Sequence, residues 1–422
     1  MSPVGTPMSD YLRGTETTVQ GGTPRRNFLK ASALFGAGAF ASRALMPAVA
    51  VAEQTQAATS STPPPSPAPA TQYGPASATG SVAEVYQRAR QALYPICRVC
   101  PQCDGVACAG EFPGMGGLGS GMSFQNNFRG LQRVQLKLRP LNGVSNQNKK
   151  PDTSTVIFGQ RISFPAMAAP IGGLAINFQN RMPDAQYFDA IIGGCVDAGT
   201  MGSIGDGQRS PMDVVKTRYD VIARYHGKAI AGIKPRPQEN LIRVIRIAEA
   251  ADAFMITIDI DSAGRYKGDP RDVAVEPKTV AQLRELVRAT RIPIVVKGIM
   301  TPEDALLAGE AGAAGICVSN HGGRVLDHTP GTADVLPAIA DKVKRKMVIL
   351  VDGCVHYGDD VLKYVALGAD AVLVGRHLIR AAFGDGRQGV ALFMKTMRDE
   401  LEAAMVVTAV PNVAAINHHI LA

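Results

Sequence analysis

Short apolar runs recur between residues 164 and 376, and a segment with helical spacing follows each run. The runs are FPAMAAP (164–170), GTMGSIG (199–205), KAIAGIKP (228–235), AFMITIDI (253–260), IPIVVKGI (292–299), AGICVSN (314–320), MVILVDG (347–353) and DAVLVGR (370–376). One intervening segment, TPEDALLAGEAG, opens with Thr301, Pro302 and Glu303, which is typical of a helix cap and first turn. Strands that alternate with helices predict βαβ units and a parallel sheet.

Eight such units favour an α/β fold, a (β/α)8 TIM barrel, over residues 151–422. An open, doubly wound sheet is the alternative. The first run is not followed by the Gly-x-Gly-x-x-Gly turn that many doubly wound sheets use to bind dinucleotides, and this weakens the alternative.

The first 52 residues have the pattern of a twin-arginine export signal. Arg25 and Arg26 lie in PRRNFLK (24–30), an apolar stretch follows, and small-x-small sequences at residues 48–52 offer cleavage points. Arg43 interrupts the apolar stretch, so its uninterrupted part is shorter than the roughly 20 residues that a membrane span needs. A multi-pass membrane protein is therefore excluded, and we expect a periplasmic or other extracytoplasmic location. An uncleaved signal that tethers the chain to the membrane is the alternative.

Residues 53–80 are rich in Pro, Ala, Ser and Thr and contain almost no large apolar side chains, which predicts a linker without fixed structure. The sequence VAEVYQRARQAL follows Ser81 and has helical spacing, so we expect the folded part to begin there. Residues 81–150 are then a helical and Cys/Gly-rich segment before the barrel. The formal net charge of +8 comes without a Lys/Arg-rich tract and favours solubility and anion handling over nucleic-acid binding.

Polar residues gather where the predicted strands end, which is where barrels of this type place their chemistry. A single histidine or lysine at a strand end is usually a hydrogen-bonded surface residue, but several consistent ends together favour a functional site. The residues concerned are Thr257, Asp259, Arg265, Lys297, Ser319, His321, Arg324, Asp352, Gly353, Gly375 and Arg376.

These segments resemble the FMN-dependent α-hydroxy-acid dehydrogenase/oxidase family, which includes glycolate oxidase, lactate oxidase and flavocytochrome b2. The resemblance covers roughly residues 124–416, and its SNHGGR and KG motifs are highly specific. It is found in PDTSTVIFGQRISFPAMAAP, PIVVKGIMTPEDALLAGEAGAAGICVSNHGGRVLD and VILVDGCVHYGDDVLKYVALGADAVLVGR.

The resemblance implies a role for each catalytic candidate. His321 takes a proton from the substrate as electrons pass to flavin N5, and a histidine suits this because its pKa lies near working pH. Asp259 stabilises the imidazolium that forms. Arg324 clamps the substrate carboxylate with its planar fork, and Arg265 is a second candidate clamp. Lys297 stabilises the anionic reduced flavin.

The resemblance also implies the FMN-binding residues. Backbone or side chains at one group of positions line the isoalloxazine, Asp352 takes the ribityl hydroxyls, and Gly353, Gly375 and Arg376 take the phosphate. Gly322 lets the backbone pass close to the ligand. The isoalloxazine group comprises Ala169, Pro170, Ile171, Ser203, Thr257, Lys297 and Ser319.

The sequence departs from the family pattern at several places, among them the family's N-terminal tyrosine, which has no clear counterpart here. In DGCVHYG, His356 stands where the family usually has an arginine, so phosphate binding depends more on Arg376. The strand AIAGIKPRP lacks the Gln and Tyr that contact flavin and substrate, and Gly205 lies near the position of another active-site aromatic residue. The substrate pocket is therefore remodelled, and the particular 2-hydroxy acid stays open.

Four cysteines, Cys97, Cys100, Cys103 and Cys108, form a C-x2-C-x2-C-x4-C pattern. The close spacing suits an iron–sulfur cluster, zinc sites more often use two separated pairs, and an exported protein favours disulfides. Metal and disulfides have equal weight in this interpretation, with free thiols behind both. The Gly-rich GMGGLGSG that follows is either a loop over the active-site mouth or a flexible linker.

The favoured function is FMN-dependent oxidation of a small 2-hydroxy acid to the 2-oxo acid. The alternatives are another FMN-barrel reaction, of the type 2 isopentenyl diphosphate isomerase kind, and a non-catalytic exported flavin- or metal-binding protein. The SNHGGR motif and the lack of support for a diphosphate pocket argue against the first alternative, and the complete set of His321, Arg324, Lys297 and Asp259 argues against the second. Oxygen, a quinone and a cytochrome all fit as electron acceptor, and the resemblance implies a homo-oligomer, often a tetramer.

Overall fold

A computed structural model describes residues 80–142, 150–207, 210–264 and 275–422. The predicted export signal, residues 53–79 of the predicted linker and Arg265 lie outside these described residues. Within them, none of the helices has both the length and the apolar character to cross a bilayer.

Eight parallel strands form one sheet in the order β3-β10-β9-β8-β7-β6-β5-β4. The two end strands also meet, because the amide of Ala168 in β3 donates to the carbonyl of Met201 just before β4, at 3.0 Å. The sheet thus curls into a barrel, and the prediction of a (β/α)8 barrel is confirmed. All eight predicted strands are present: β3 Ala166–Ala168, β4 Gly202–Gly205, β5 Ala229–Ile233, β6 Met255–Asp259, β7 Ile294–Ile299, β8 Gly315–Val318, β9 Val348–Val351 and β10 Ala371–Val374.

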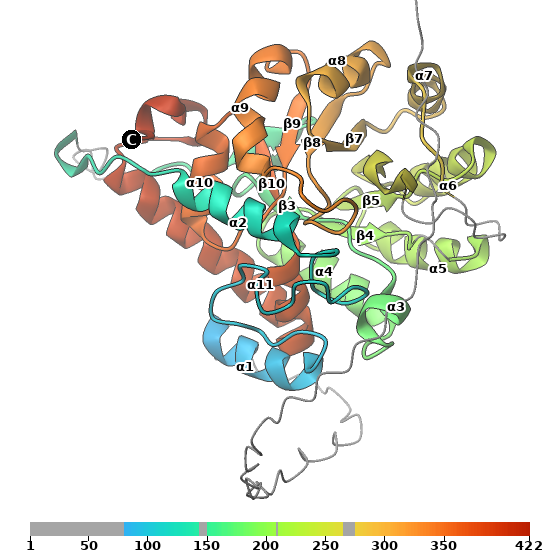
Figure 1. Cartoon of the computed structure of the whole chain (residues 1–422), viewed down its shortest axis with the longest axis horizontal. Coiled ribbons are helices and arrows are strands. Elements are labelled where there is room, and N and C mark those ends of the chain that lie inside the picture. Colours follow the sequence, from blue (N-terminus) through green and yellow to red (C-terminus); the bar gives the residue numbers. More distant parts are fainter. Residues whose placement is uncertain (1–79, 143–149, 208–209, 265–274) are drawn as a thin grey trace, which may run out of the picture. The chain divides into compact units, whose positions relative to one another are not determined.

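Helices follow the strands and surround the barrel, as Figure 1 shows. Several begin with the expected caps; the hydroxyl of Thr301, for example, accepts from the amide of Asp304, with Pro302 in the first turn. The helices of the barrel are α3 Leu174–Phe178, α4 Asp184–Asp197, α5 Met212–Ala223, α6 Gln238–Ala250, α7 Val280–Arg288, α8 Pro302–Glu310, α9 Thr332–Val343, α10 Gly358–Ala366 and α11 Arg376–Val407, which is kinked at Asp385 and Gly386. Short 3-10 helices are η1 Pro140–Asn142, η3 Ile260–Gly264, η4 Val413–Ala415 and η5 His418–Ile420.

The barrel interior has two layers, because alternate residues of a strand point to the same side. The lower layer is apolar and buried: Met167, Ile230, Met255, Val295, Cys317, Leu350 and Leu373. Two residues further along the same strands, the side chains become polar while staying buried: Thr257, Lys297, Ser319 and Asp352. The strands therefore place their polar residues at the carboxyl end of a packed apolar plug.

A short antiparallel hairpin precedes the barrel, and the hydrophobic pattern did not predict it. It pairs β1 Thr155–Ile157 with β2 Gln160–Ile162. Ile157 and Ile162 are buried in the same cluster as the lower interior layer. The hairpin therefore closes the barrel at the end opposite the polar layer.

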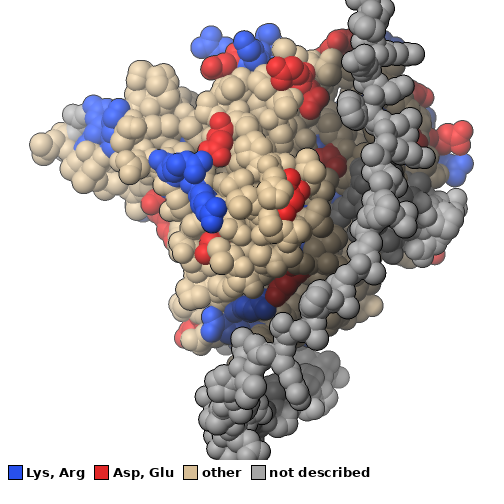
Figure 2. Space-filling view, viewed as in Figure 1, with Lys and Arg blue, Asp and Glu red and all other residues tan. Residues whose placement is uncertain are grey.

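The N-terminal helices pack on the outside of the barrel. Helix α1 Val82–Leu93 begins at a capping box in which Ser81 accepts from the amide of Glu84, so the predicted start of the folded part is confirmed. It lies against α11, and α2 Met122–Arg133 lies against α9. On the face shown in Figure 2, basic and acidic side chains are interspersed rather than gathered in a patch of one sign, in keeping with a charge that serves solubility.

Candidate active site

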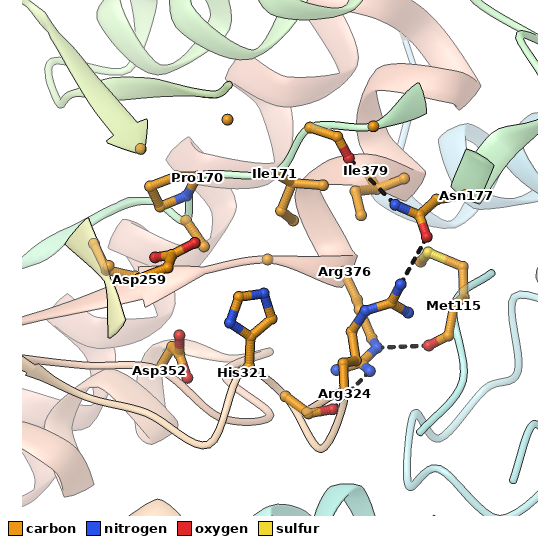
Figure 3. A pocket seen from close by; sticks show the side chains of 18 of the residues that line it. Met115, Pro170, Ile171, Asn177, Asp259, His321, Arg324, Asp352, Arg376 and Ile379 are labelled. Atoms are coloured by element: carbon orange, nitrogen blue, oxygen red, sulfur yellow. Dashed lines mark hydrogen bonds between the residues drawn. The ribbon is translucent and has the colours of Figure 1, made fainter. Parts of the chain in front are cut away.

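A cavity opens at the carboxyl ends of the strands and is lined by most of the predicted site residues. These are Ala169, Pro170, Ile171, Asp259, Lys297, His321, Gly322, Arg324, Asp352, Gly353, Gly375 and Arg376. Figure 3 shows His321 between two carboxylates, Asp259 and Asp352, and two arginines, Arg324 and Arg376. Ser203, Thr257 and Ser319 are buried in the strands that form this end of the barrel.

His321 is oriented by contacts on both ring nitrogens. Its Nδ1 lies 3.1 and 3.2 Å from the two carboxylate oxygens of Asp261 in η3. Its Nε2 lies 3.3 Å from Nζ of Lys234, and its backbone amide donates to the hydroxyl of Ser319 at 3.0 Å. Asp261 is thus the carboxylate at hydrogen-bond distance of the imidazole, a contact that the sequence did not predict, while the charge of Asp259 also favours a protonated His321, as expected.

Asp259 instead forms an ion pair with two lysines. Its Oδ2 accepts from Nζ of Lys234 at 2.5 Å, and its Oδ1 lies 3.7 Å from Nζ of Lys297. Burial raises the pKa of Asp259, but the two ammonium groups outweigh burial and hold the pKa below its usual value. Asp259 is thus an ionised group whose charge balances the lysines around it.

Lys297 and Asp352 form a second pair inside the barrel, with Nζ 3.6 Å from Oδ2. Burial opposes the charge of Lys297, but Asp259 and Asp352 together raise its pKa. Burial also raises the pKa of Asp352, with Lys297 and the hydroxyl of Ser319 acting in the opposite direction. The lysine is therefore a fixed cation, as an electrostatic role requires.

Two buried polar atoms at this end of the barrel suit the groups that FMN presents. Among the described residues, Thr257 Oγ1 and Asp352 Oδ1 are buried without a hydrogen-bond partner. Such atoms are costly to bury unless a ligand or water completes their bonds. A hydroxyl beside the isoalloxazine and a carboxylate beside ribityl hydroxyls match the roles that the family resemblance implies, so the residues present fit the cofactor.

Three consecutive residues after β8 have left-handed backbone conformations: His321 (φ 58°), Gly322 (φ 62°) and Gly323 (φ 73°). A Cβ at Gly322 would lie 2.6 Å from Nη1 of Arg376, and one at Gly323 would lie 2.4 Å from the amide nitrogen of Phe124. The sequence predicted glycines here because the backbone passes close to a ligand. The structure adds a second reason, since other parts of the protein pack too closely to leave room for a side chain. The strained turn fixes the direction of the His321 ring.

Residues 114–121, which we call the strap, lie over the mouth of the cavity. Arg324 Nη1 donates to the carbonyl of Gly114 at 2.5 Å, and Arg376 Nε donates to the carbonyl of Met115 at 2.8 Å. The amide of Leu118 donates to the carbonyl of Gly323 at 2.8 Å. The hypothesis that GMGGLGSG is a loop over the active-site mouth is confirmed. Both arginines predicted to bind anions are at the same time bonded to the strap.

The four N-terminal cysteines converge on one small cavity with Arg376 and Arg380. Within the described residues no group of three or more His, Cys, Asp or Glu side chains is arranged to hold a metal ion, and Cys97, Cys100, Cys103 and Cys108 are all free thiols in this structure. A metal or disulfide role for these cysteines therefore stays a prediction.

The surroundings of these thiols combine burial with positive charge. Arg380 is buried and its Nη2 donates to the sulfur of Cys103 at 3.1 Å. Burial raises the pKa of Cys103 and raises that of Cys108 to about 11, while the nearby arginines act in the opposite direction.

His356 does not replace the family's phosphate-binding arginine. Its ring stacks on His377 with centroids 3.8 Å apart, and burial, with Arg380, lowers its pKa to about 4. A neutral, stacked imidazole cannot supply the missing charge, so Arg376 is the cation at this end of the cavity.

Sequence reasoning missed Lys234, and Asp261, as site residues. Lys234 was detectable, because it continues the inward-pointing series Ile230 and Gly232 of β5. Asp261 was not, because it lies in η3, beyond the end of β6, where strand alternation no longer applies. The second predicted carboxylate clamp, Arg265, lies outside the described residues.

Comparisons with known proteins agree with this geometry. Residues 114–282 and 272–422 match the protein-family model described as FMN-dependent dehydrogenase. A peroxisomal (S)-2-hydroxyacid oxidase of Arabidopsis thaliana is 29% identical over 335 residues, which cover 71% of this chain and 87% of that protein. An L-lactate oxidase of Lysinibacillus sphaericus is 42% identical over 161 residues, which cover 38% of this chain and 42% of that protein.

Solved structures of mandelate oxidase share the fold. A variant with 2-hydroxy-phenylacetamide has a TM-score of 0.64 and 28% identity, covering 79% of this chain and 96% of that one. Another variant, with an FMN adduct, has a TM-score of 0.63 and 27% identity, covering 79% and 97%. The barrel, the strand-end residues and the family match agree, and the chain belongs to the family of FMN-dependent dehydrogenases.

Proposed function

We propose that the protein oxidises a small 2-hydroxy acid to the 2-oxo acid with FMN as its cofactor. The observation that supports this most directly is His321, whose Nδ1 faces a carboxylate and whose Nε2 faces the cavity side lined by Lys234 and Arg324. A base, a carboxylate-binding arginine and a buried lysine in one cavity are the groups that proton removal beside a carboxylate requires.

Each residue of the site has a distinct role in the proposed oxidation. Arg324 binds and orients the substrate carboxylate through its planar guanidinium. His321 Nε2 accepts the hydroxyl proton while Nδ1–H donates to Asp261, which stabilises the imidazolium. FMN, when bound, supplies the acceptor for the two electrons that leave the substrate. Lys297 holds a positive charge in the buried layer next to Asp352 and stabilises negative charge there.

Two glycines, Gly205 and Gly232, lie in the wall of the cavity. A Cβ at Gly232 would lie 2.2 Å from Cβ of Pro170, and one at Gly205 would lie 2.5 Å from the amide nitrogen of Gly172. The segment that follows β3 therefore packs against the glycines of β4 and β5. For this reason we assign the substrate by class, a small 2-hydroxy acid, and not by analogy with glycolate or lactate.

The test is the visible spectrum of anaerobic, purified protein before and after addition of a panel of 2-hydroxy acids. Flavin bands that bleach with one acid and return on oxidation support the proposal. Flavin bands that no acid bleaches contradict the substrate class, and a well-folded sample without flavin that also takes up no added FMN contradicts the proposal altogether. Mixing the reduced protein with oxygen, a quinone or a cytochrome then distinguishes the acceptors, and light scattering tests the tetramer expected from the family resemblance.

We also propose that residues 1–52 direct export by the twin-arginine route and that the mature protein works outside the cytoplasm. PRRNFLK followed by a moderately apolar stretch supports this proposal. Replacement of both Arg25 and Arg26 by lysine is expected to keep the full chain in the cytoplasm with its FMN bound. Unchanged fractionation of this double variant would contradict the proposed route.

A further inference from the structure

Lys234 is a cation of the active site whose role the family resemblance leaves unassigned. It follows directly after β5, and its side chain is only 15% exposed. Its Nζ donates to Asp259 Oδ2 at 2.5 Å and lies 3.3 Å from His321 Nε2, and it lines the same cavity as both residues. The lysine therefore touches the nitrogen that the proposed reaction uses.

The two contacts of His321 select one tautomer. A lysine ammonium has three donors and no acceptor, so it makes a favourable contact with Nε2 only when that nitrogen presents its lone pair. Nδ1 faces the carboxylate of Asp261, an acceptor, and so carries the proton. The resting imidazole is thus neutral, with its basic nitrogen directed at Lys234.

We propose that Lys234 is a positioning residue that keeps His321 neutral in the Nδ1–H tautomer until substrate binds. This inference rests on the proposed function, because it takes His321 as the base. When the substrate O–H bond breaks and its proton forms the N–H bond at Nε2, the ammonium loses its acceptor there. It keeps the ion pair with Asp259, 2.5 Å away, so one hydrogen bond is exchanged and no charge is left without a counter-ion.

The surrounding charges make Lys234 the cation that opposes early protonation of His321. Asp259 is shared between Lys234 and Lys297, and Asp352 is paired with Lys297. Arg324 and Arg376 bond to the strap. The charged groups on the elements packed around the imidazole are Lys234, Asp259, Asp261, Lys297, Arg324, Asp352 and Arg376. Among these, the carboxylates of Asp261 and Asp259 favour a second proton on the ring, and Lys234, at 3.3 Å from the site of protonation, disfavours it.

The experiment follows the imidazole directly by nuclear magnetic resonance of 15N-histidine-labelled, FMN-loaded protein. His321→Gln identifies the resonance. We expect the neutral Nδ1–H tautomer in the unmodified protein and a titration midpoint that rises by about one pH unit in Lys234→Met. Lys234→Gln, which keeps a donor for Asp259 without the charge, is expected to shift it in the same direction. Lys228→Met, an exposed lysine at the other end of β5, is the matched control and leaves the midpoint unchanged.

Two results would overturn the proposal: an Nε2–H tautomer in the unmodified protein, or an unchanged midpoint in both Lys234 variants. These readouts need no turnover, so they stand even if no 2-hydroxy acid reduces the flavin, which is how the proposed function itself would fail. With an active substrate, the acidic limb of kcat/KM is expected to move to higher pH by the same amount in Lys234→Met and to return in Lys234→Arg. A loss of activity that is uniform with pH indicates a purely structural role and contradicts the inference.

Discussion

At the scale of single residues, the site is built by alternation along strands. Met255, Thr257 and Asp259 lie on one side of β6, and Val295 and Lys297 lie on one side of β7. The inner members of each series are apolar and fill the barrel, while the outer members are polar and face the cavity or the groups that line it. A functional residue here is thus recognised by its residue type and also by whether its place in the strand points its side chain into the barrel.

His321→Gln tests the base. Glutamine keeps the size and a polar group but cannot take up a proton at working pH, so we expect the rate of anaerobic flavin reduction to fall at least about 100-fold with FMN still bound. His328→Gln, seven residues on and with a largely exposed side chain, is the control and is expected to retain the full rate. A rate within a few-fold of normal in His321→Gln would show that another group removes the proton.

The residue scale also shows where sequence reasoning succeeds and where it stops. His321, Lys297, Arg324 and Asp352 were identified because strand ends and the family motifs mark them. The pairing of His321 with Asp261, and of Asp259 with two lysines, could not be read from spacing. Which of two carboxylates in Asp-x-Asp turns toward the histidine depends on the 3-10 turn of η3, a local geometry that the pattern does not specify.

At the scale of elements, the strap joins the N-terminal segment to the two arginines of the cavity. Its glycines allow the backbone of the strap to lie close to the preceding segment, because a Cβ at Gly116 would lie 2.0 Å from the carbonyl oxygen of Cys108. The strap also donates and accepts across the mouth, through the amide of Leu118 and the carbonyls of Gly114 and Met115. It therefore determines how free Arg324 and Arg376 are to meet anionic ligands.

Gly116→Ala is expected to loosen the strap. The added methyl group forces a backbone shift that costs about 1–3 kcal/mol, so amide exchange across residues 114–121 should accelerate about tenfold or more while the barrel strands keep their protection. Hydrogen exchange read by mass spectrometry measures this. Gly159→Ala is the control, because a Cβ there meets no atom within 4 Å although φ is +79°. Equal exchange in the two variants would mean that packing at Gly116 does not hold the strap.

A stack of rings fastens α1 to the barrel. Tyr86 of α1 hydrogen-bonds Nδ1 of His377 at 2.9 Å, and His377 stacks on His356. Burial lowers the pKa of His377 well below its ordinary value and lowers that of His356 to about 4. These three residues come from α1, from the loop after β9 and from α11. Protonation of the stacked histidines is therefore expected to change the free energy of unfolding.

The stack predicts a loss of stability in mild acid. Above about pH 6.5 both states of His356 are neutral; below it the unfolded chain binds a proton that the folded protein does not accept until about pH 4. The free energy of unfolding should therefore fall as pH drops from about 6.5 to 4, by at most about 1.4 kcal/mol per pH unit for this group. His356→Phe is expected to lose less stability over that window, measured by urea unfolding at several pH values. His418→Phe, at an exposed site, should follow the unmodified protein.

At the scale of the whole molecule, the fold was accessible from the sequence because each strand is a compact apolar run with its own helix. Such units have few alternatives once the connections are short and right-handed. The hairpin β1–β2 was missed since three-residue strands give too little alternation to detect. The convergence of the four cysteines with Arg380 was equally inaccessible, because it joins a loop near residue 100 to the start of α11.

The last prediction concerns the oxidation state and the metal content of the cysteines. All seven cysteines of the chain lie within the described residues, and all are free. Cys97, Cys195 and Cys317 are buried, and burial shields a thiol from oxidants as well as from metals. We therefore expect native protein to show the same intact mass before and after reduction, and to contain no stoichiometric iron or zinc.

Unfolding the same sample in air exposes the buried thiols and should allow disulfides to form. If reduction adds the mass of two hydrogens per disulfide to a native sample, the cysteines are not free. Stoichiometric iron with sulfide would show that they hold an iron–sulfur cluster.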